Sequence, residues 1–290
     1  MEQAINVQSL AQKRRTYFKH PGSLIVFLLT WLAALLTMGV LVFLIGYILI
    51  KGVPFLTPDL FKLEYNSDNV SMLPSIINTL IMIGVALLIA VPVGVFSAVY
   101  LTEYAKKGNK LVQVIRITAE TLSGIPSIVY GLFGMLFFVT ALHWGMSLLA
   151  GACTLVIMVL PLIMRTTEEA LLAVSDSYRE ASFGVGAGKL RTVFKIVLPA
   201  AMPGILSGVI LAIGRIVGET AALIYTAGTV AEVSKGLLSS GRTLAIHMYV
   251  LSSEGLYTNQ AYATAVVLLI FVLIINFMSS LVAKKFAAKD

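Results

Sequence analysis

Hydrophobic residues dominate the chain in six long runs, and the segments between them carry most of the polar and charged residues. The runs cover residues 24–50, 74–101, 117–142, 145–164, 203–227 and 261–283. An apolar helix of about 20 residues is long enough to cross the hydrocarbon core of a bilayer. The pattern therefore predicts six transmembrane helices. The first run is too long for the apolar part of a signal peptide, and we expect it to remain as an uncleaved span.

Composition agrees with this pattern. Of the 290 residues, 58% are hydrophobic and only 12% are charged, a balance typical of an integral membrane protein. No stretch outside the runs is long enough to form a soluble core of its own. The sequence predicts an all-α membrane protein, and its one cysteine, Cys153, has no partner for a disulfide.

The placement of Lys and Arg predicts the topology. Most of the 21 basic residues lie before the first run, between the second and third, between the fourth and fifth, and after the sixth. Loops rich in Lys and Arg remain on the cytoplasmic side. We therefore expect both termini and the 165–199 loop to be cytoplasmic. The formal net charge of +7 then reflects topology, and it gives no reason to expect nucleic acid as a partner.

Charged residues inside the fifth run form the first candidate site. Arg215 and Glu219 are four residues apart, which would place them on one helix face. Small residues continue that face in both directions, so we expect it to meet a second helix or a pore. Charges at membrane depth are costly and mark substrate paths or paired interior sites. Two interpretations stay open: the two side chains neutralise each other as a clamp, or Arg215 contacts a substrate.

The third run contains a second polar stripe. Arg116, Glu120 and Ser127 precede or accompany glycines that would fall on nearly the same helix face. Pro126 should break or kink this helix and free backbone groups, either as a packing kink or at a functional cavity.

Other chemistry finds little support in the sequence. His20, His143 and His247 are scattered without metal-ligand spacing, and no serine-nucleophile motif is present. Glu168, Glu169 and Asp176 should form a solvated face beside the 165–199 loop.

The motif GVGAGK in that loop resembles a nucleotide P-loop only superficially. Phe183 stands where the first glycine of the P-loop belongs, and Leu190 stands where its metal-binding hydroxyl belongs. The loop instead predicts two short helices, 165–174 and 178–184, with residues 175–177 able to cap the second. Exposed apolar residues on such helices would suit a docking surface.

The loop also resembles the signature of ABC importer permeases, which reads E-A-A, three residues, G, nine residues, I-x-L-P. In those permeases the loop forms a coupling helix that docks on an ATPase subunit. The matching residues are Glu180, Ala181, Ser182, Gly186, Ile196, Leu198 and Pro199. Only Ser182 departs from the pattern.

Further segments narrow the resemblance. TEYAKKG at 102–108, SGIPSIVYGLFG at 123–134, the segment 203–228 and AIHMYVLSSEG downstream are similar to PstA-type permeases of phosphate importers. The likeness runs from about residue 74 to the C-terminus. It implies a type I ABC importer permease fold in a bacterial or archaeal cell (inner) membrane. The expected divisions are an N-terminus with first span and external loop at 1–73, a five-helix core at 74–283 containing the coupling loop at 165–199, and a cytoplasmic tail at 284–290.

The resemblance also implies partners. A PstC-like permease would pair with this chain, two ATPase subunits holding ATP and Mg²⁺ would dock from inside, and a phosphate-binding protein would dock from outside. The chain itself would bind no cofactor and catalyse no reaction. Its substrate pathway would include Arg215, Glu219, Glu120 and Ser127.

Alternatives remain open within and outside transport. The chain could be a permease for sulfate or molybdate, or the PstC-type half of the same importer. A membrane enzyme acting on lipid or peptide, and a scaffold that senses phosphate without transport, are the alternatives from other classes.

Overall fold

The computed structural model describes residues 21–106 and 108–287, and the described residues form helices and loops. Contacts divide the chain into two units, residues 1–51 and 52–290. The first unit contains most of helix α2 (Pro21–Gly52), which is apolar and long enough to cross a membrane. The second unit contains all the other helices. The all-α prediction is confirmed.

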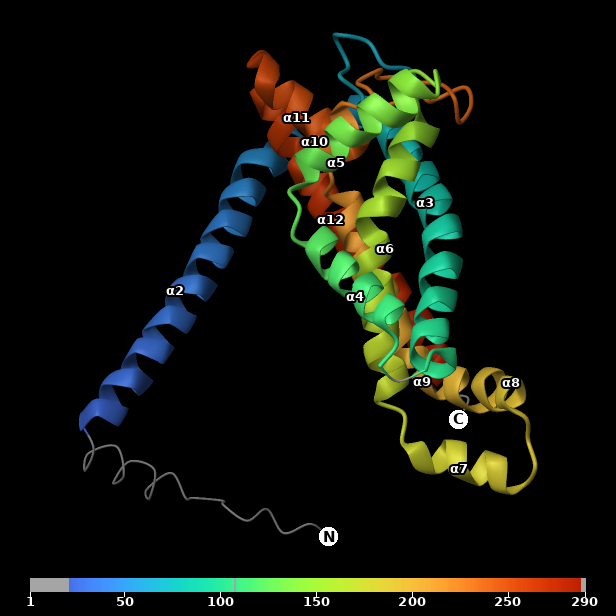
Figure 1. Ribbon diagram of the computed structural model, residues 1–290. Coiled ribbons are helices and arrows are strands. Elements are labelled where there is room, and N and C mark those ends of the chain that lie inside the picture. The colour runs from blue at the N-terminus through green and yellow to red at the C-terminus, as the bar shows by residue number, and fades with distance from the viewer. Residues whose placement is uncertain (1–20, 107, 288–290) are drawn as a thin grey trace. The chain divides into compact units, whose positions relative to one another are not determined.

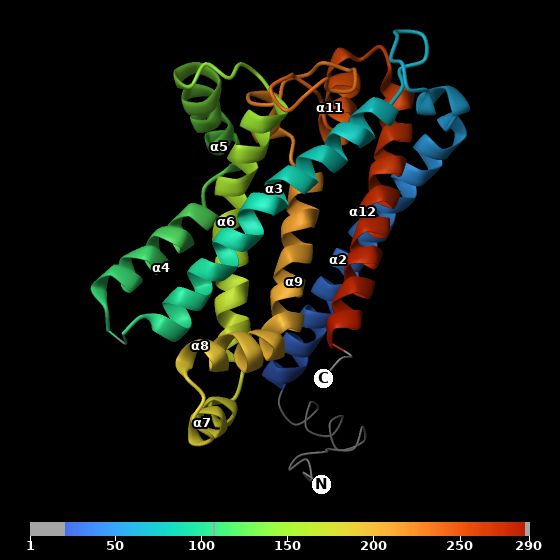
Figure 2. The same cartoon turned by 90° about the vertical axis from the view of Figure 1, so that its right-hand side faces the viewer.

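Long helices form the body of the second unit, and short helices lie at its two ends (Figures 1 and 2). We call these the α7 end and the α11 end. The long helices are α3 (Leu73–Val99), α6 (Leu148–Leu172), α9 (Leu198–Val217) and α12 (Thr258–Ala287). The short helices are α7 (Asp176–Gly184) and α8 (Lys189–Thr192) at one end, with η1 (Val53–Phe55), η2 (Pro58–Phe61), α10 (Ala221–Ile224) and α11 (Leu244–Glu254) toward the other.

The third predicted span is broken. Helix α4 (Lys110–Ser123) and helix α5 (Ser127–Gly134), which continues as the π-helical segment η4 (Met135–Ala141), meet at an angle of 103°. Pro126 precedes α5 and cannot donate a backbone hydrogen bond, which favours a helix boundary here. The break or kink predicted at Pro126 is confirmed, but the single polar face expected for Arg116, Glu120 and Ser127 was wrong, because the two segments run in different directions. The described residues hold five helices able to span a membrane, or six if the bent pair counts as one span.

Two other boundaries differ from the sequence pattern. Helix α6 continues through Leu172, so residues 165–172 extend a long helix and form no helix of their own. The following long helix begins at Lys189, passes through the π-helical turn η5 (Val193–Val197) and ends at Val217, not at residue 227. Charged residues can continue a helix beyond its apolar part, and apolar residues can continue beyond the end of a helix. Hydropathy alone therefore misplaced these two ends.

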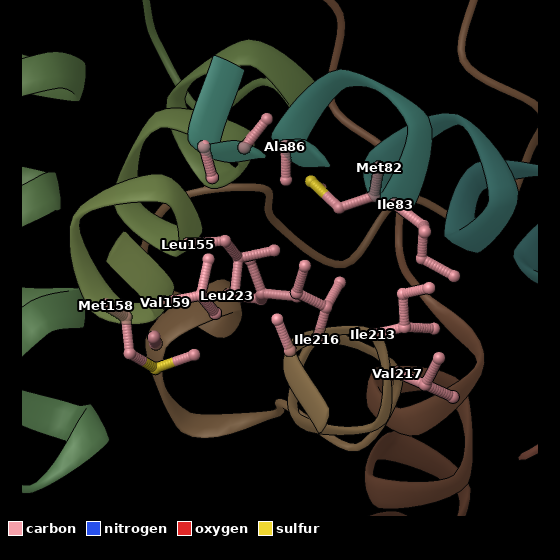
Figure 3. Packing of buried hydrophobic residues seen from close by; sticks show 14 of the residues in the cluster. Met82, Ile83, Ala86, Leu155, Met158, Val159, Ile213, Ile216, Val217 and Leu223 are labelled. Carbon is pink, nitrogen blue, oxygen red and sulfur yellow. The ribbon is translucent and has the colours of Figure 1, made fainter. Parts of the chain in front are cut away.

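The hydrophobic core lies between α3, α6 and α9 and is closed by α10. Figure 3 shows the side chains converging from these helices: Met82, Ile83 and Ala86 of α3, Leu155, Met158 and Val159 of α6, Ile213, Ile216 and Val217 of α9, and Leu223 of α10. These residues are almost completely buried. Burial of such side chains is the main favourable contribution to helix packing within the unit.

Glycines bring α9 close to α6. A Cβ placed on Gly204 would lie 2.6 Å from the Cβ of Ala170, and one on Gly208 would overlap Thr166. The small-residue face predicted in the fifth run therefore meets a second helix, as expected. That helix belongs to the same chain.

Two buried polar side chains lie at the α11 end. Arg242 is 3% exposed and places its guanidinium 4.5 Å from the ring centroid of Tyr65. The ring of His247 meets the same tyrosine edge-on, with centroids 6.3 Å apart, and is fully buried. Burial and the charge of Arg242 lower the pKa of His247 from 6.5 to about 3, against a smaller opposing effect of the Val70 backbone.

Replacing Gly204 with alanine should destabilise the second unit by about 1–3 kcal/mol, because the new Cβ would be forced against Ala170. The measurement is the melting temperature of the purified protein in detergent. Gly214→Ala is the matched control, since nothing lies within 4 Å of a Cβ at that position. Adding Ala170→Gly to Gly204→Ala should recover most of the lost stability. Equal melting temperatures for the two single variants would contradict the close contact.

His247 should make the protein sensitive to acid. The folded protein keeps this imidazole neutral, whereas the unfolded chain binds a proton near pH 6.5. The stability that depends on the neutral form is thus complete above pH 6.5 and is lost as the pH falls toward 3, by about 1.4 kcal/mol per pH unit.

Melting temperatures measured from pH 7 to pH 4.5 test this. His247→Asn should lose less stability across that range than the wild type. His143→Asn is the control, because His143 is exposed in a loop and asparagine tolerates its positive φ of 57°. Parallel pH curves for His247→Asn and the wild type would show that another group causes the sensitivity.

Candidate functional site

A cavity of about 560 Å³ runs beside α6 from Pro161 to Leu172, the last residue of that helix. Helix α4 forms its second wall, and Arg215 near the end of α9 and Leu101 in the π-helical turn η3 (Tyr100–Tyr104) complete it. Pro161, Arg165, Glu168 and Leu172 are spaced by three or four residues, so they share one face of α6. Arg165 and Glu168 are thus the polar side chains of the α6 face that runs along the cavity.

Six charged side chains line the cavity, three basic and three acidic: Arg116, Arg165, Arg215, Glu120, Glu168 and Glu169. Two ion pairs use four of them. Arg116 of α4 pairs with Glu168 of α6, whose side chain is 17% exposed, and so joins the two walls. Arg165 pairs with Glu169 through its Nε, 3.0 Å from Oε1, along the exposed surface of α6.

Arg215 and Glu120 are the two remaining charges. Neither forms an ion pair with any of the described residues. Arg215 is partly buried, and Glu120 is exposed on α4. The guanidinium of Arg215 is therefore the cation of this cavity that remains available to an anion, in a place where charge-assisted hydrogen bonds are stronger than in bulk water.

The structure separates Arg215 from Glu219. Helix α9 ends at Val217, so the two residues do not share a helix face, and that expectation was wrong. The Glu219 side chain is 9% exposed, and its Oε1 accepts a hydrogen bond of 3.0 Å from the backbone N–H of Ala222. Glu219 thus caps the start of α10. No ion pair between Arg215 and Glu219 is present among the described residues, which leaves the clamp interpretation without support.

Ser127 lies on the other side of the break. It is the first residue of α5 and is absent from the described cavity lining, whereas Glu120 of α4 belongs to that lining. The hydroxyl of Tyr130 donates a hydrogen bond of 2.6 Å to the carbonyl oxygen of Leu122. This bond crosses the break and adds to the hydrogen bond of 3.1 Å that the same carbonyl accepts from the backbone N–H of Ile125.

Sequence reasoning missed the role of Glu168. We expected a solvated glutamate, but its side chain faces the cavity and pairs with Arg116. The three- and four-residue spacing from Pro161 to Leu172 is the signal that could have revealed it. Glu169 is 64% exposed, which agrees with the expected solvated face.

Helix α7 presents a second candidate surface, at the end of the unit nearest α8. Ser175 caps it by accepting from the N–H of Ser177, as the sequence predicted. Gly186 ends the segment with φ of +81°, a conformation that favours glycine. Large apolar side chains stand exposed around the helix: Tyr178, Phe183, Val185 and Leu190. We call these four residues the α7 docking surface.

The signature residues of this loop occupy different environments. Glu180 and Ala181 are exposed on α7, whereas Ser182 is buried, with its hydroxyl 2.8 Å from that of Thr192 on α8. The one departure from the signature therefore adds a hydrogen bond between α7 and α8.

The last three signature residues are helical. Ile196 belongs to η5, and Leu198 and Pro199 open α9. Because α9 directly continues η5, Pro199 lies within the long helix that begins at Lys189, just after its π-helical turn. Helix α8 begins directly after Gly188, so the glycine-rich turn ends there and residues 189–199 are helical.

Comparison with known proteins identifies the family. Residues 90–289 match the model of the binding-protein-dependent transport system inner membrane component. The chain belongs to this family. Its members named below are permeases of ABC transporters.

Two relatives match this permease over nearly its whole length. The probable ABC transporter permease protein YqgI of Bacillus subtilis is 33% identical over 89% of this chain and 95% of its own. The phosphate transport system permease protein PstA of Haemophilus influenzae is 30% identical over 93% of this chain and 96% of its own. PstA 1 of Mycobacterium tuberculosis is 43% identical over 52% of this chain and 49% of its own length.

Solved structures show the same fold. A chain of the bacterial ABC transporter that imports alginate superimposes with a TM-score of 0.66 at 15% identity, covering 94% of the permease described here and 99% of the alginate chain. A chain of the MetNI methionine transporter gives a TM-score of 0.57 at 22% identity, over 74% and 94% of the two chains. The expected type I ABC importer permease fold is confirmed.

If the cavity contains water, a cysteine at its wall should react with a hydrophilic thiol reagent. Ser123 is exposed and lines the cavity, and Leu88 is exposed on α3 outside it. In a Cys153→Ser background, Ser123→Cys should be labelled about tenfold faster than Leu88→Cys, because the reactive thiolate needs water. Labelling is followed by mass spectrometry in opened membrane vesicles. Slow labelling at both positions would show that the cavity is dry.

Proposed function

We propose that this permease is one half of the translocation pathway of an ATP-driven importer of inorganic phosphate. The observation that carries the proposal is the position of Arg215, a guanidinium without an ion pair among the described residues, at the wall of a charged cavity. A guanidinium offers a planar fork of donors that matches the oxygens of a tetrahedral oxyanion.

The relatives favour phosphate among the oxyanions. PstA proteins of Haemophilus influenzae, Mycobacterium tuberculosis and Mycoplasma pneumoniae are named as phosphate transport system permeases. Their identity to this chain is 30–43%. By this argument sulfate and molybdate are the less favoured substrates, and a PstC-type assignment is less favoured than a PstA-type one.

The arrangement of charge suits passage of an anion rather than tight binding. Glu120 lines the same cavity as Arg215 and carries the opposite charge. Its negative potential would weaken the hold of Arg215 on phosphate, so that the ion could leave. Glu219 would act at a distance from the ion, by fixing the turn after α9 through its bond to Ala222.

The assembly follows from topology. By the positive-inside rule the α7 end and both termini lie in the cytoplasm, and the α11 end lies outside the cell membrane. The α7 docking surface would bind an ATPase subunit. Glu180, Ala181 and Gly186 belong to the segment that would contact that subunit. A PstC-like permease would stand beside this chain, and a second ATPase subunit would dock on it. A phosphate-binding protein would deliver the ion at the α11 end. ATP and Mg²⁺ would be held by the ATPase subunits.

The proposal is tested by ATP-dependent uptake of ³²P-phosphate into vesicles that contain the whole complex. Arg215→Gln should reduce uptake about tenfold or more while leaving assembly intact, because the anion loses a charged donor. Lys110→Gln is the control, as Lys110 is an exposed cation at the start of α4 and does not belong to the described cavity lining. Unchanged uptake by Arg215→Gln would remove Arg215 from the pathway. A wild-type complex that moved sulfate but not phosphate would overturn the choice of substrate.

A further inference from the structure

Arg179 joins three helices at the α7 end. It lies in the second turn of α7, yet its side chain is only 15% exposed because it points back toward the body of the unit. Its Nη2 lies 2.6 Å and its Nε 3.1 Å from Oε1 of Glu103. Glu103 belongs to η3, the π-helical turn that directly continues α3, and its side chain is 8% exposed. The ion pair therefore connects α7 to the end of α3.

The same guanidinium also caps α6. Its Nη1 donates to the carbonyl oxygen of Val174 at 2.8 Å, and its Nη2 donates to that of Leu171 at 2.9 Å. Carbonyl groups in the last turn of a helix have no partner within the helix, and a cation there is favoured by the helix dipole. A shorter or uncharged side chain could not reach the carboxylate and both carbonyls at once.

Neighbouring contacts reinforce this connection. The ammonium of Lys189, at the start of α8, lies 5.2 Å from the ring centroid of Tyr104, the residue after Glu103. Beneath the ion pair, a buried apolar cluster is shared by the ends of α3, α6 and the α8–α9 helix: Ala98, Val99, Leu171, Val174, Val193, Val197, Ala201 and Ile205. The end of α3 is thus held to the loop on both sides of α7.

Helix α7 has two faces with different contacts. Tyr178 and Phe183 stand 57% and 48% exposed, whereas Arg179 is enclosed by α3 and α6. A partner bound to the exposed face could displace α7, and the contacts of the buried face determine which neighbouring helices move with it.

We propose that the Arg179–Glu103 ion pair transmits movement of α7 to α3, and so couples ATP hydrolysis on the partner to opening of the transport pathway. This inference rests on the proposed function. Arg179 and Glu103 are positioning residues in it and contact neither ATP nor the transported ion. Loss of the pair leaves α7 able to receive the ATPase subunit, but its displacement reaches α3 incompletely.

The test is the number of phosphate ions moved per ATP hydrolysed by the complete complex in vesicles. Glu103→Gln keeps the size of the side chain and removes its charge. The ratio should fall about five- to tenfold while ATP hydrolysis and the amount of bound ATPase subunit stay near wild type.

Asp176→Asn provides the matched control. Asp176 also bonds Arg179, with Oδ1 3.1 Å from Nη1, but it lies on α7 itself and is 88% exposed. Asp176→Asn removes the negative charge beside Arg179 but leaves the contact between α7 and α3 in place. The ratio of ions moved to ATP hydrolysed should therefore not change. An equal fall in Asp176→Asn and Glu103→Gln would overturn the proposal.

Two other results would overturn it as well. One is an unchanged ratio in Glu103→Gln. The other is loss of the ATPase subunit from that variant, since it would assign the pair to folding of the docking helix. If Glu103→Gln yields no folded permease in the membrane, Glu103→Asp replaces it, because it keeps the charge and shortens the reach, and a wild-type ratio there contradicts the proposal. The ratio is measured for whichever oxyanion the wild type moves, so a wild type that excludes phosphate contradicts the proposed function alone.

Discussion

Close packing of α6 against α3 and α9 is the constraint on which the second unit depends. The helices meet through small residues: Gly94 of α3 faces Ile163 of α6, and Gly204 of α9 faces Ala170. Inside a membrane such contacts replace the hydrophobic effect as the source of helix association, because lipid is as apolar as the side chains. With two faces of α6 occupied in this way, its remaining polar stripe from Pro161 to Leu172 turns to α4 and lines the cavity. The position of the candidate site follows from the packing of its neighbours.

The break at Pro126 determines which helices α4 and α5 pack against. It turns α5 away from the line of α4, so that a Cβ on Gly131 would come within 2.8 Å of the backbone of Ala222 in α10. Helix α4 is left to cover α6 with its charged face. A straight helix would have carried both groups of contacts to one neighbour. Backbone groups freed by such a break must be satisfied within the protein, and turn hydrogen bonds from Gly124 and Ile125 do this at the break, with the Tyr130 hydroxyl as a second donor to Leu122.

Sequence reasoning succeeded where a property is local. Hydropathy located the spans, Ser175 marked the start of α7, and Gly186 marked its end because glycine accepts the positive φ found there. It failed where a tertiary contact decides. Pro126 predicted a kink but not its angle, which is set by what α4 and α5 pack against.

The same limit applies to individual charges. Apolar residues continue past Val217, so nothing in the pattern shows that α9 ends there and that Glu219 turns to cap α10. The pairing of Glu168 with Arg116 depends on two helices meeting, and periodicity predicts only the face on which each residue lies.

The advantage of a buried ion pair between α7 and α3 over an apolar contact is geometric specificity and not stability. Taking Arg179 and Glu103 out of water carries a desolvation cost that apolar side chains would avoid, and such pairs often add little net stability. Their geometry is nevertheless specific: a guanidinium bound to one carboxylate and two helix-terminal carbonyls has few alternative arrangements. An apolar contact can slide as helices shift, whereas this one fixes α7 at a single register against α3 and α6. In the proposed coupling, α7 gains more from that fixed register than from extra stability.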